Sequence, residues 1–292
     1  MSKIIIILLL ILVIILTISH MYKDWIQKYR KKDLDFKNAL INDEFDIYIQ
    51  PKYNLKNESI VGAECLVRWN SKSKGVISPE KFIYILEKDK SIIELDFYIL
   101  NEAFKIINRW SSNGLKLIPI SVNISRITLI EDDTFITRLN YLIKKYNIDT
   151  KYLEIELTER IMLRETSKIV SVIKKIRDLG IKVSLDDFGA GYSSLNILKN
   201  LPVDAIKLDK LFLDKKDISE KGKIVIENII NMARALGLEV VAEGVEYFEQ
   251  AKILKSIGCE IVQGYLYGRP MSISEFEQLE TFNKNDYIKL NL

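Results

Sequence analysis

The 292-residue sequence predicts an α/β fold in which about eight strands close into a TIM-like (β/α)8 barrel. Short runs rich in Ile, Val and Leu alternate with segments of helical periodicity over most of the chain. Runs such as VSL at 183–185 and VVA at 240–242 are apolar without alternation, as in parallel strands that are buried on both faces. No glycine-rich phosphate loop follows the first strand, which disfavours the alternative of a doubly wound open sheet.

An apolar segment precedes this pattern at the N-terminus. Residues 4–16 are all Ile, Leu or Val and the next charge is Lys23, so a helix here would reach roughly 28 Å, close to the hydrocarbon thickness of a bilayer. We expect residues 1–22 to form a single transmembrane helix rather than a cleaved signal peptide, because no small-x-small site follows. Lys3 alone precedes the segment, whereas five basic residues follow it by position 32, which predicts a single-pass protein of the cell membrane with its body in the cytoplasm.

The elements of the body follow in order after a charged connector at 23–43. An alternating segment, FDIYIQP at 45–51, is joined through a polar stretch at 54–59 to an apolar run that ends in ECLVRW at 64–69, which predicts a β-hairpin. Helical periodicity from 79 to 110 comes next. Six further strands, separated by helices, are predicted at LIPISVN 117–123, YLEIELTE 152–159, IKVSLDD 181–187, DAIKLD 204–209, LEVVAEG 238–244 and CEIVQGY 259–265.

Glycines mark the boundaries of two helices. Gly180 and Gly237 come directly before strands, as expected for glycine in the left-handed position that ends a helix. The pattern as a whole predicts four parts, which are an anchor at 1–22, a connector at 23–43, a barrel at 44–282 and a tail at 283–292.

Composition narrows the class of function. A formal net charge of +3 with 28% charged residues gives no strong field, so a nucleic-acid polymer is not an expected partner. The two cysteines, Cys65 and Cys259, lie far apart without CxxC spacing, which argues against a disulfide scaffold or a zinc site and fits a reducing compartment. The single histidine, His20, lies in the anchor and no nucleophilic serine motif is found, so covalent acyl chemistry is disfavoured.

Polar side chains close one predicted strand after another. They are Glu64, Asn123, Glu156, Asp186, Asp187, Lys207, Glu243 and Gln263. Taken singly, Glu64 or Asn123 is an ordinary surface residue, but together the set indicates a shared site, because the carboxyl ends of parallel barrel strands meet at one rim. Adjacent carboxylates such as Asp186 and Asp187 repel unless a cation or a proton separates them, and their place before a glycine turn favours a cation. Hard oxygen ligands without a usable histidine favour Mg²⁺ or Mn²⁺ over zinc and predict metal-assisted hydrolysis of a phosphodiester.

Two further features belong to this rim. Lys207 lies within an apolar strand, where nearby carboxylates must neutralise its charge. The GAG sequence at 189–191 has neither the lysine of a phosphate-binding loop nor a GxGxxG pattern, so it predicts a mobile loop beside the site rather than a phosphate cradle.

Eight short motifs occur in one order along the predicted barrel. They are QPK at 50–52, ECLVRW at 64–69, SVNIS at 121–125, ELTE at 156–159, DDFGAGYSSL at 186–195, IKLD at 206–209, EGVE at 243–246 and QGYLYGRP at 263–270. Together they resemble the motif set of the EAL-domain phosphodiesterases, a family that hydrolyses cyclic di-GMP to linear pGpG. The resemblance covers residues 45–282 and implies a TIM-like barrel with one antiparallel strand. Cys65 stands where the family's name motif has Ala, and Gly268 replaces a common Ser, but neither change removes a ligand.

The resemblance also implies roles for individual residues. The implied ligands of one or two Mg²⁺ or Mn²⁺ ions are Glu64, Asn123, Glu156, Asp186 and Asp187, with Glu243 completing the site or acting through a water held there. Lys207 would position or deprotonate the attacking water, and Gln263 would orient a water or a metal-bound group. Glu159 would hold the DDFGAG loop, which the family links to metal binding and to dimerisation, so a homodimer is expected. Gln50 and Arg68 would contact cyclic di-GMP, Arg68 through a guanidinium fork suited to phosphate.

Two other functions are weighed. A catalytically silent cyclic di-GMP receptor, the fate of relatives that have lost metal ligands, is disfavoured because no ligand and no lysine is missing here. A membrane-bound interaction protein that uses the barrel only as a scaffold would leave the clustered carboxylates unexplained, since like charges destabilise a fold without a cation. We therefore expect a metal-dependent phosphodiesterase that lowers cyclic di-GMP at the cytoplasmic face of the membrane.

Overall fold

The computed structural model describes residues 36, 38–72, 75–159, 161, 166–190, 198, 201–213 and 218–280. The predicted anchor, most of the connector and the predicted tail lie outside these residues, so the domain boundaries and the transmembrane helix stay predictions. Within the described ranges, no helix combines the length and the apolar character that are needed to cross a bilayer.

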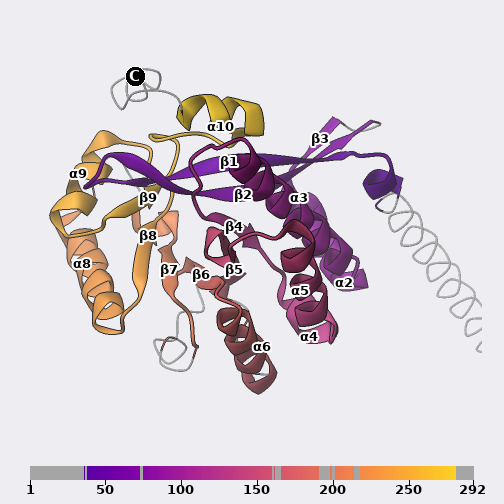
Figure 1. The fold of residues 1–292 in the computed structure, drawn as a ribbon. Coiled ribbons are helices and arrows are strands. Elements are labelled where there is room, and N and C mark those ends of the chain that lie inside the picture. The colour runs from indigo at the N-terminus through magenta and orange to yellow at the C-terminus, as the bar shows by residue number, and fades with distance from the viewer. Residues whose placement is uncertain are drawn as a thin grey trace, which may run out of the picture. The chain divides into compact units, whose positions relative to one another are not determined.

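The described strands join in one hydrogen-bonded sheet, around which most of the helices lie (Figure 1). The strands are β1 (Phe45–Asn54), β2 (Ser59–Ser71), β3 (Gly75–Ile77), β4 (Ile120–Asn123), β5 (Leu153–Thr158), β6 (Lys182–Phe188), β7 (Ala205–Leu208), β8 (Glu239–Ala242), β9 (Ile261–Gln263) and β10 (Met271–Ser272). The helices are α2 (Pro79–Asp89), α3 (Ile92–Ser112), α4 (Arg126–Glu131), α5 (Phe135–Tyr146), α6 (Thr166–Asp178), α8 (Glu220–Ala235), α9 (Phe248–Ser256) and α10 (Ile273–Glu280), with 3₁₀ turns η1 (Thr150–Tyr152) and η3 (Lys210–Leu213).

Eight of the described strands close into a barrel. From β2 through β4 to β9, each strand pairs parallel with the next one around the sheet. β1 pairs antiparallel with β9 and also pairs with β2, so it closes the ring and runs against the other barrel strands. This arrangement confirms the predicted TIM-like barrel with one antiparallel strand. The short strands β10 and β3 extend the sheet as antiparallel neighbours of β1 and β2.

The chain divides into two compact units. They are Met1–Asp46 with Trp69–Ile77, and Ile47–Arg68 with Ser78–Leu292. In the smaller unit, Trp69 packs on Phe45 with ring centroids 5.3 Å apart and donates its indole N–H to Glu44 at 3.0 Å. The larger unit contains the parallel strands β4 to β9 and every residue of the candidate site.

Local chemistry divides the predicted helical stretch at 79–110 into two helices. α2 begins at Pro79, whose fixed φ suits the first helical turn, and ends before Lys90, which has a left-handed φ of 66°. The Asp89 carboxylate then accepts a hydrogen bond from the Ser91 backbone N–H at 3.0 Å, so the chain turns before α3 begins. Both helices have the same apolar periodicity, so this pattern alone does not predict the short polar turn between them.

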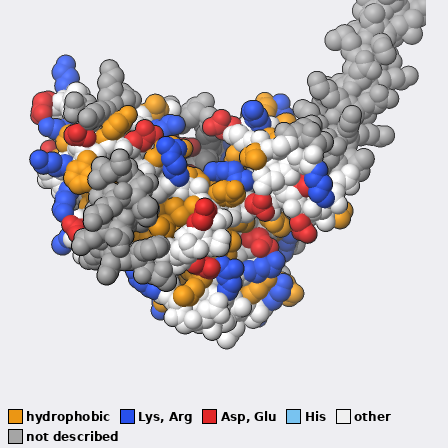
Figure 2. All heavy atoms as spheres, turned by 90° about the horizontal axis from the view of Figure 1, so that it is seen from above, with side chains coloured by type: hydrophobic (Ala, Val, Ile, Leu, Met, Phe, Trp, Pro, Cys, Tyr) orange, Lys and Arg blue, Asp and Glu red, His pale blue; other side chains and the backbone are white. Residues whose placement is uncertain are grey.

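The strand register brings the predicted site residues to one end of the barrel. Asn123 at the end of β4 pairs with Glu156 on β5, and Thr158 at the end of β5 pairs with Asp186 on β6. Side chains alternate along each strand, so Glu156 points into the barrel while Ile155, which is fully buried, packs on the opposite face. Figure 2 shows acidic and basic side chains interspersed over the described part of the visible face, rather than gathered by sign.

Candidate metal centre

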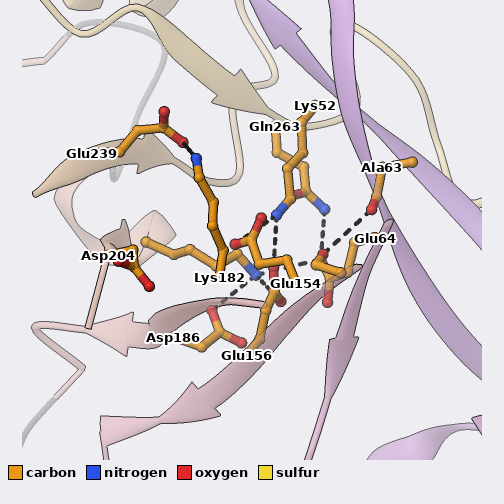
Figure 3. A network of polar contacts seen from close by, with 12 residues as sticks. Lys52, Ala63, Glu64, Glu154, Glu156, Lys182, Asp186, Asp204, Glu239 and Gln263 are labelled. Atoms are coloured by element: carbon orange, nitrogen blue, oxygen red, sulfur yellow. Dashed lines mark hydrogen bonds and ion pairs between the residues drawn. The ribbon is translucent and has the colours of Figure 1, made fainter. Parts of the chain in front are cut away.

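Five carboxylates gather at the carboxyl ends of the parallel strands. Glu64, Glu156 and Asp186, from β2, β5 and β6, offer oxygens that lie within 4.8 Å of one another. Asp186, Asp187 and Glu243, the last from the loop directly after β8, form a second group of the same kind. Because the two groups share Asp186, the described residues supply two adjoining sets of three oxygen ligands. Figure 3 shows Glu64, Glu156 and Asp186 turned toward a common centre.

An irregularity in β6 lets two adjacent aspartates serve the same site. Successive strand residues normally point to opposite faces. Here the ladder between β6 and β7 shifts register between Leu185 and Phe188, and Asp187 has a left-handed φ of 55°. Asp186 is buried and Asp187 is exposed, so the pair presents one inner and one outer carboxylate to the cluster.

The ammonium of Lys207 lies among these carboxylates. Its Nζ is 2.6 Å from both Glu156 Oε2 and Glu243 Oε1, 3.0 Å from Asp186 Oδ1 and 3.5 Å from Glu64 Oε2. Burial by itself lowers the pKa of this lysine, but the surrounding carboxylates outweigh it and raise the pKa of Lys207 well above 10.5. The lysine is therefore neutralised by acidic partners, as the sequence predicts, and it holds its proton.

Burial and nearby charges shift the pKa values of the carboxylates at this site. Burial raises the pKa of Glu64 to about 7. Burial also raises the pKa of Asp186, and it raises the pKa of Glu243 well above 4.5. For Glu156, burial is outweighed by two nearby ammoniums, above all that of Lys207, which lower its pKa to about 2. Glu64, Asp186 and Glu243 thus ionise less readily than usual, because burial disfavours their charged forms and the nearby ammoniums only partly compensate for it.

Amide side chains fix the orientation of Glu64. Asn123 donates its Nδ2–H to Glu64 Oε1 at 2.6 Å, and Gln263 donates its Nε2–H to Glu64 Oε2 at 2.7 Å. The same amide group of Gln263 donates to Gln50 Oε1 at 3.2 Å, while Gln50 donates to the Gly268 carbonyl at 2.9 Å. The structure thus brings both glutamines and Asn123 to the carboxylates, and the role of Asn123 as a metal ligand stays a prediction.

Glu159 lies against the loop that follows the two aspartates. Its Oε2 accepts a hydrogen bond from the Gly189 backbone N–H at 3.2 Å. Gly189 has a φ of 100°, and a Cβ added there would lie 2.1 Å from the ring of Phe212 in η3. Glycine is therefore required for this loop to pack against η3. The contact agrees with the loop-holding role that the family resemblance implies for Glu159.

A cavity of about 260 Å³ opens beside the carboxylates. Its lining includes Gln50, Glu64, Asp187, Glu243, Gln263 and Tyr265. Arg68 does not contact the carboxylates in the described part of the chain. Its Nη1 donates to the Val67 carbonyl at 2.9 Å and its guanidinium lies 5.6 Å from the ring centroid of Tyr48. Arg68 is the predicted site residue that the structure leaves apart from the cluster.

Sequence reasoning missed two charged residues of this network. Lys52 on β1 contacts Glu156 Oε1 at 2.8 Å and Glu154 Oε1 at 3.4 Å. Both were visible as strand residues, since Glu154 shares one face of its strand with Glu156 and Lys52 shares one face with Gln50. That shared face was the signal that could have found them.

The donor set fits a hard divalent cation. Carboxylate oxygens are the ligands that Mg²⁺ and Mn²⁺ prefer, and the two groups of three oxygens contain no histidine or cysteine. The raised pKa of Glu64 and of Glu243 means that their ionised forms are disfavoured, and a bound cation would stabilise those forms. Glu64, Glu156, Asp186, Asp187 and Glu243 are the residues that would hold such a cation.

Known proteins are similar to this sequence over most of its length. The sequence profile of the EAL domain matches residues 33–270. The cyclic di-GMP phosphodiesterase PA2567 of Pseudomonas aeruginosa is 35% identical over 233 residues, which cover 80% of this chain and 39% of that protein. The cyclic di-GMP phosphodiesterase PdeR of Escherichia coli is 35% identical over 253 residues, which cover 86% of this chain and 38% of that protein. This chain thus spans less than half the length of these relatives.

A solved structure shares the fold. The PaMucR phosphodiesterase in complex with c-di-GMP superposes with a TM-score of 0.78 at 29% identity, covering 84% of this chain and 99% of that one. The profile match, the identities and the barrel agree, and the chain belongs to the EAL domain family.

Proposed function

We propose that this protein is a metal-dependent phosphodiesterase that hydrolyses cyclic di-GMP to linear pGpG. The observation that carries the proposal is the set of five carboxylates at the rim of an EAL-family barrel, four of which contact Lys207. Two relatives that match over 80% or more of the chain, PA2567 and PdeR, are named cyclic di-GMP phosphodiesterases. A receptor that had lost catalysis would be expected to lack one of these acids or the lysine, and the chain has all of them.

The proposed chemistry divides between the cations and the residues of the chain. One or two bound Mg²⁺ or Mn²⁺ ions would activate a water and offset the charge of the phosphodiester. Lys207 keeps its proton and is suited to orient the attacking water and to stabilise negative charge as it develops on the phosphate. Glu243 lies 2.6 Å from that ammonium, and its ionised carboxylate would be placed to accept the proton of the water.

The amides and Arg68 are proposed to orient the nucleotide. Gln50 and Gln263 line the cavity beside the carboxylates. Gln263 Oε1 is buried and has no hydrogen-bond partner among the described residues, so it is a ready acceptor for a water or a ligand. Arg68 follows Glu64 by four residues on the same face of β2, which places its guanidinium nearer to the rim, where a phosphate would lie.

Location and assembly are separate parts of the proposal. The apolar run at residues 4–16 and the basic residues after it support a single-pass anchor with the barrel at the cytoplasmic face. Recovery of the full chain in the soluble fraction without detergent would argue against it. The family resemblance supports a homodimer, which light scattering of the full chain tests directly.

Turnover of cyclic di-GMP by the full chain tests the proposed activity. The nucleotide is incubated with Mg²⁺, Mn²⁺ or Ca²⁺ and the products are separated by chromatography. We expect wild-type protein to produce pGpG with Mg²⁺ or Mn²⁺ and no pGpG with a chelator. The Glu64→Gln variant should produce none. The control variant Glu227→Gln, which changes an exposed residue of α8, should hydrolyse the nucleotide at the wild-type rate. Saturable binding of intact nucleotide without product would instead identify a receptor.

A further inference from the structure

A buried ion pair, Lys52 with Glu154, adjoins the carboxylate cluster inside the barrel. β1 runs against the parallel strands, so Lys52 follows Gln50 one step farther from the rim, in register with Gln263. On β5, Glu154 precedes Glu156 by two residues on the same face and is likewise one step deeper. Lys52 is 4% exposed and Glu154 is 8% exposed, so water screens neither charge well.

Lys52 holds the oxygen of Glu156 that Lys207 does not hold. Lys52 Nζ lies 2.8 Å from Glu156 Oε1, whereas Lys207 Nζ lies 2.6 Å from Glu156 Oε2. The terminal torsion of a glutamate is broad and roughly two-fold, so a single contact leaves the plane of the carboxylate poorly fixed. One ammonium on each oxygen fixes it. Figure 3 shows Lys52 reaching Glu156 from the side of β1, with Glu154 beside it.

We propose that Lys52 is a positioning residue of the metal centre, which orients the Glu156 carboxylate beside Glu64 and Asp186, and that Glu154 balances its charge. The inference rests on the proposed function insofar as it assigns Glu156 to a cation. Charge alternates from Glu154 through Lys52 and Glu156 to Lys207, so each buried group has an opposite neighbour.

Stability of the fold does not account for this pair. Replacing a buried ion pair by apolar residues of similar volume is often neutral or stabilising, whereas removing one partner is strongly destabilising. By contrast, groups that hydrogen-bond to metal ligands orient those ligands, and their loss commonly costs about 10–100-fold in metal affinity or activity. A pair that contacts Glu156 is placed to act in this second way.

The test separates folding from metal binding in the full chain. Both partners are replaced together in Lys52→Met/Glu154→Met and in Lys52→Met/Glu154→Gln, so that neither buried charge is left without its partner. Glu154→Gln alone keeps the contact between Lys52 and Glu156. The matched control is Lys223→Met/Glu220→Met, an ion pair of 2.6 Å on the outer helix α8. Mn²⁺ binding is measured without nucleotide, from the electron paramagnetic resonance signal of free Mn²⁺, and the unfolding midpoint is measured alongside.

We expect the double variants to unfold near the wild-type midpoint while their Mn²⁺ dissociation constant rises about 10–100-fold. The kcat should fall with it, and KM for cyclic di-GMP should stay within about threefold, because the nucleotide contacts are untouched. Glu154→Gln and the control should bind Mn²⁺ within about threefold of wild type. One folded double variant is enough for the comparison.

Three outcomes would overturn the inference. They are a folded double variant that binds Mn²⁺ as tightly as wild type or more tightly, a Glu154→Gln variant that weakens binding as much as the double variants, and a control that weakens it equally. If wild-type protein binds Mn²⁺ but leaves cyclic di-GMP intact, the proposed activity fails while the metal titration still decides the role of Lys52.

Discussion

We expect the metal-free protein to lose stability between pH 6 and pH 8 because of Glu64. Burial raises the pKa of Glu64 from 4.5 to about 7, so in this range the folded protein holds a proton that the unfolded chain has released. The stabilising contribution is complete below pH 4.5 and is lost as the pH rises through 7. Between pH 6 and pH 8 the folded state gives up about 0.8 proton at this group, and the free energy of unfolding falls by about 1.4 kcal/mol.

Other groups at the site act in the same direction or outside this pH range. Burial raises the pKa of Asp186 and of Glu243, so their contributions also decline as the pH rises. Glu156, with its pKa lowered to about 2, contributes stability above pH 4.5 that is lost only as the pH falls toward 2. Lys207, whose pKa lies well above 10.5, contributes stability that is lost only above that pH. Outside the site, burial also raises the pKa of Asp96 to about 7, so Asp96 adds to the loss between pH 6 and pH 8. The part of the loss that is due to Glu64 is the part that Glu64→Gln removes.

Urea unfolding of the full chain with a chelator, followed by tryptophan fluorescence at pH 6 and pH 8, measures this loss. Glu64→Gln removes the titrating group, so its unfolding free energy should fall by about 1.4 kcal/mol less than that of wild type over the same interval. Glu227→Gln, an exposed change on α8, should follow the wild type. The reasoning is wrong if wild-type protein is as stable at pH 8 as at pH 6, or if Glu64→Gln shows the full loss.

Three further substitutions test the site. Lys207→Met should abolish hydrolysis at saturating Mn²⁺, because the variant lacks the ammonium that is proposed to orient the attacking water; turnover at the wild-type rate would contradict this role. Gly189→Ala should lower the free energy of unfolding in urea by about 1–3 kcal/mol, because the added Cβ would meet the ring of Phe212 and the φ of 100° disfavours a side chain. An unchanged unfolding midpoint would show that the loop adjusts without cost. Glu159→Ala removes the acceptor of the Gly189 N–H, so kcat should fall in steady-state assays, and wild-type kinetics would exclude a loop-holding role.

The rim of the site could be predicted from the sequence because the relevant signal is local. A polar residue at the end of an apolar run marks the carboxyl end of a parallel strand, and the register that pairs Asn123 with Glu156 follows from successive βα units. The closing strand is different. The direction of β1 came from the predicted hairpin of residues 45–69 and from the family resemblance, and not from a polar residue at a strand end.

The residues that were missed depend on contacts between distant strands. Lys52 meets Glu156 across 104 positions of sequence, through the pairing of β1 with β9 that closes the barrel. No local pattern encodes which side chain faces Lys52 inside a closed barrel. The position of Arg68 could not be predicted from local sequence either. Its residue type suggests a phosphate contact, but its position beside Tyr48 follows from the packing of β1 and β2.

Metal binding should release protons, and the number released should fall as the pH rises. Burial raises the pKa of Glu64 to about 7 despite the nearby ammonium of Lys207, so Glu64 holds a proton that a divalent cation must displace. From Glu64 alone, Mn²⁺ should release about 0.9 proton at pH 6 and about 0.1 at pH 8. Titration calorimetry in buffers of different ionisation enthalpy counts these protons. A protonated carboxylate ligand releases fewer protons to the solvent as the pH rises, because it is already more ionised before the cation binds. A proton count of zero at pH 6, or a count that increases toward pH 8, would therefore mean that the cation does not bind at Glu64.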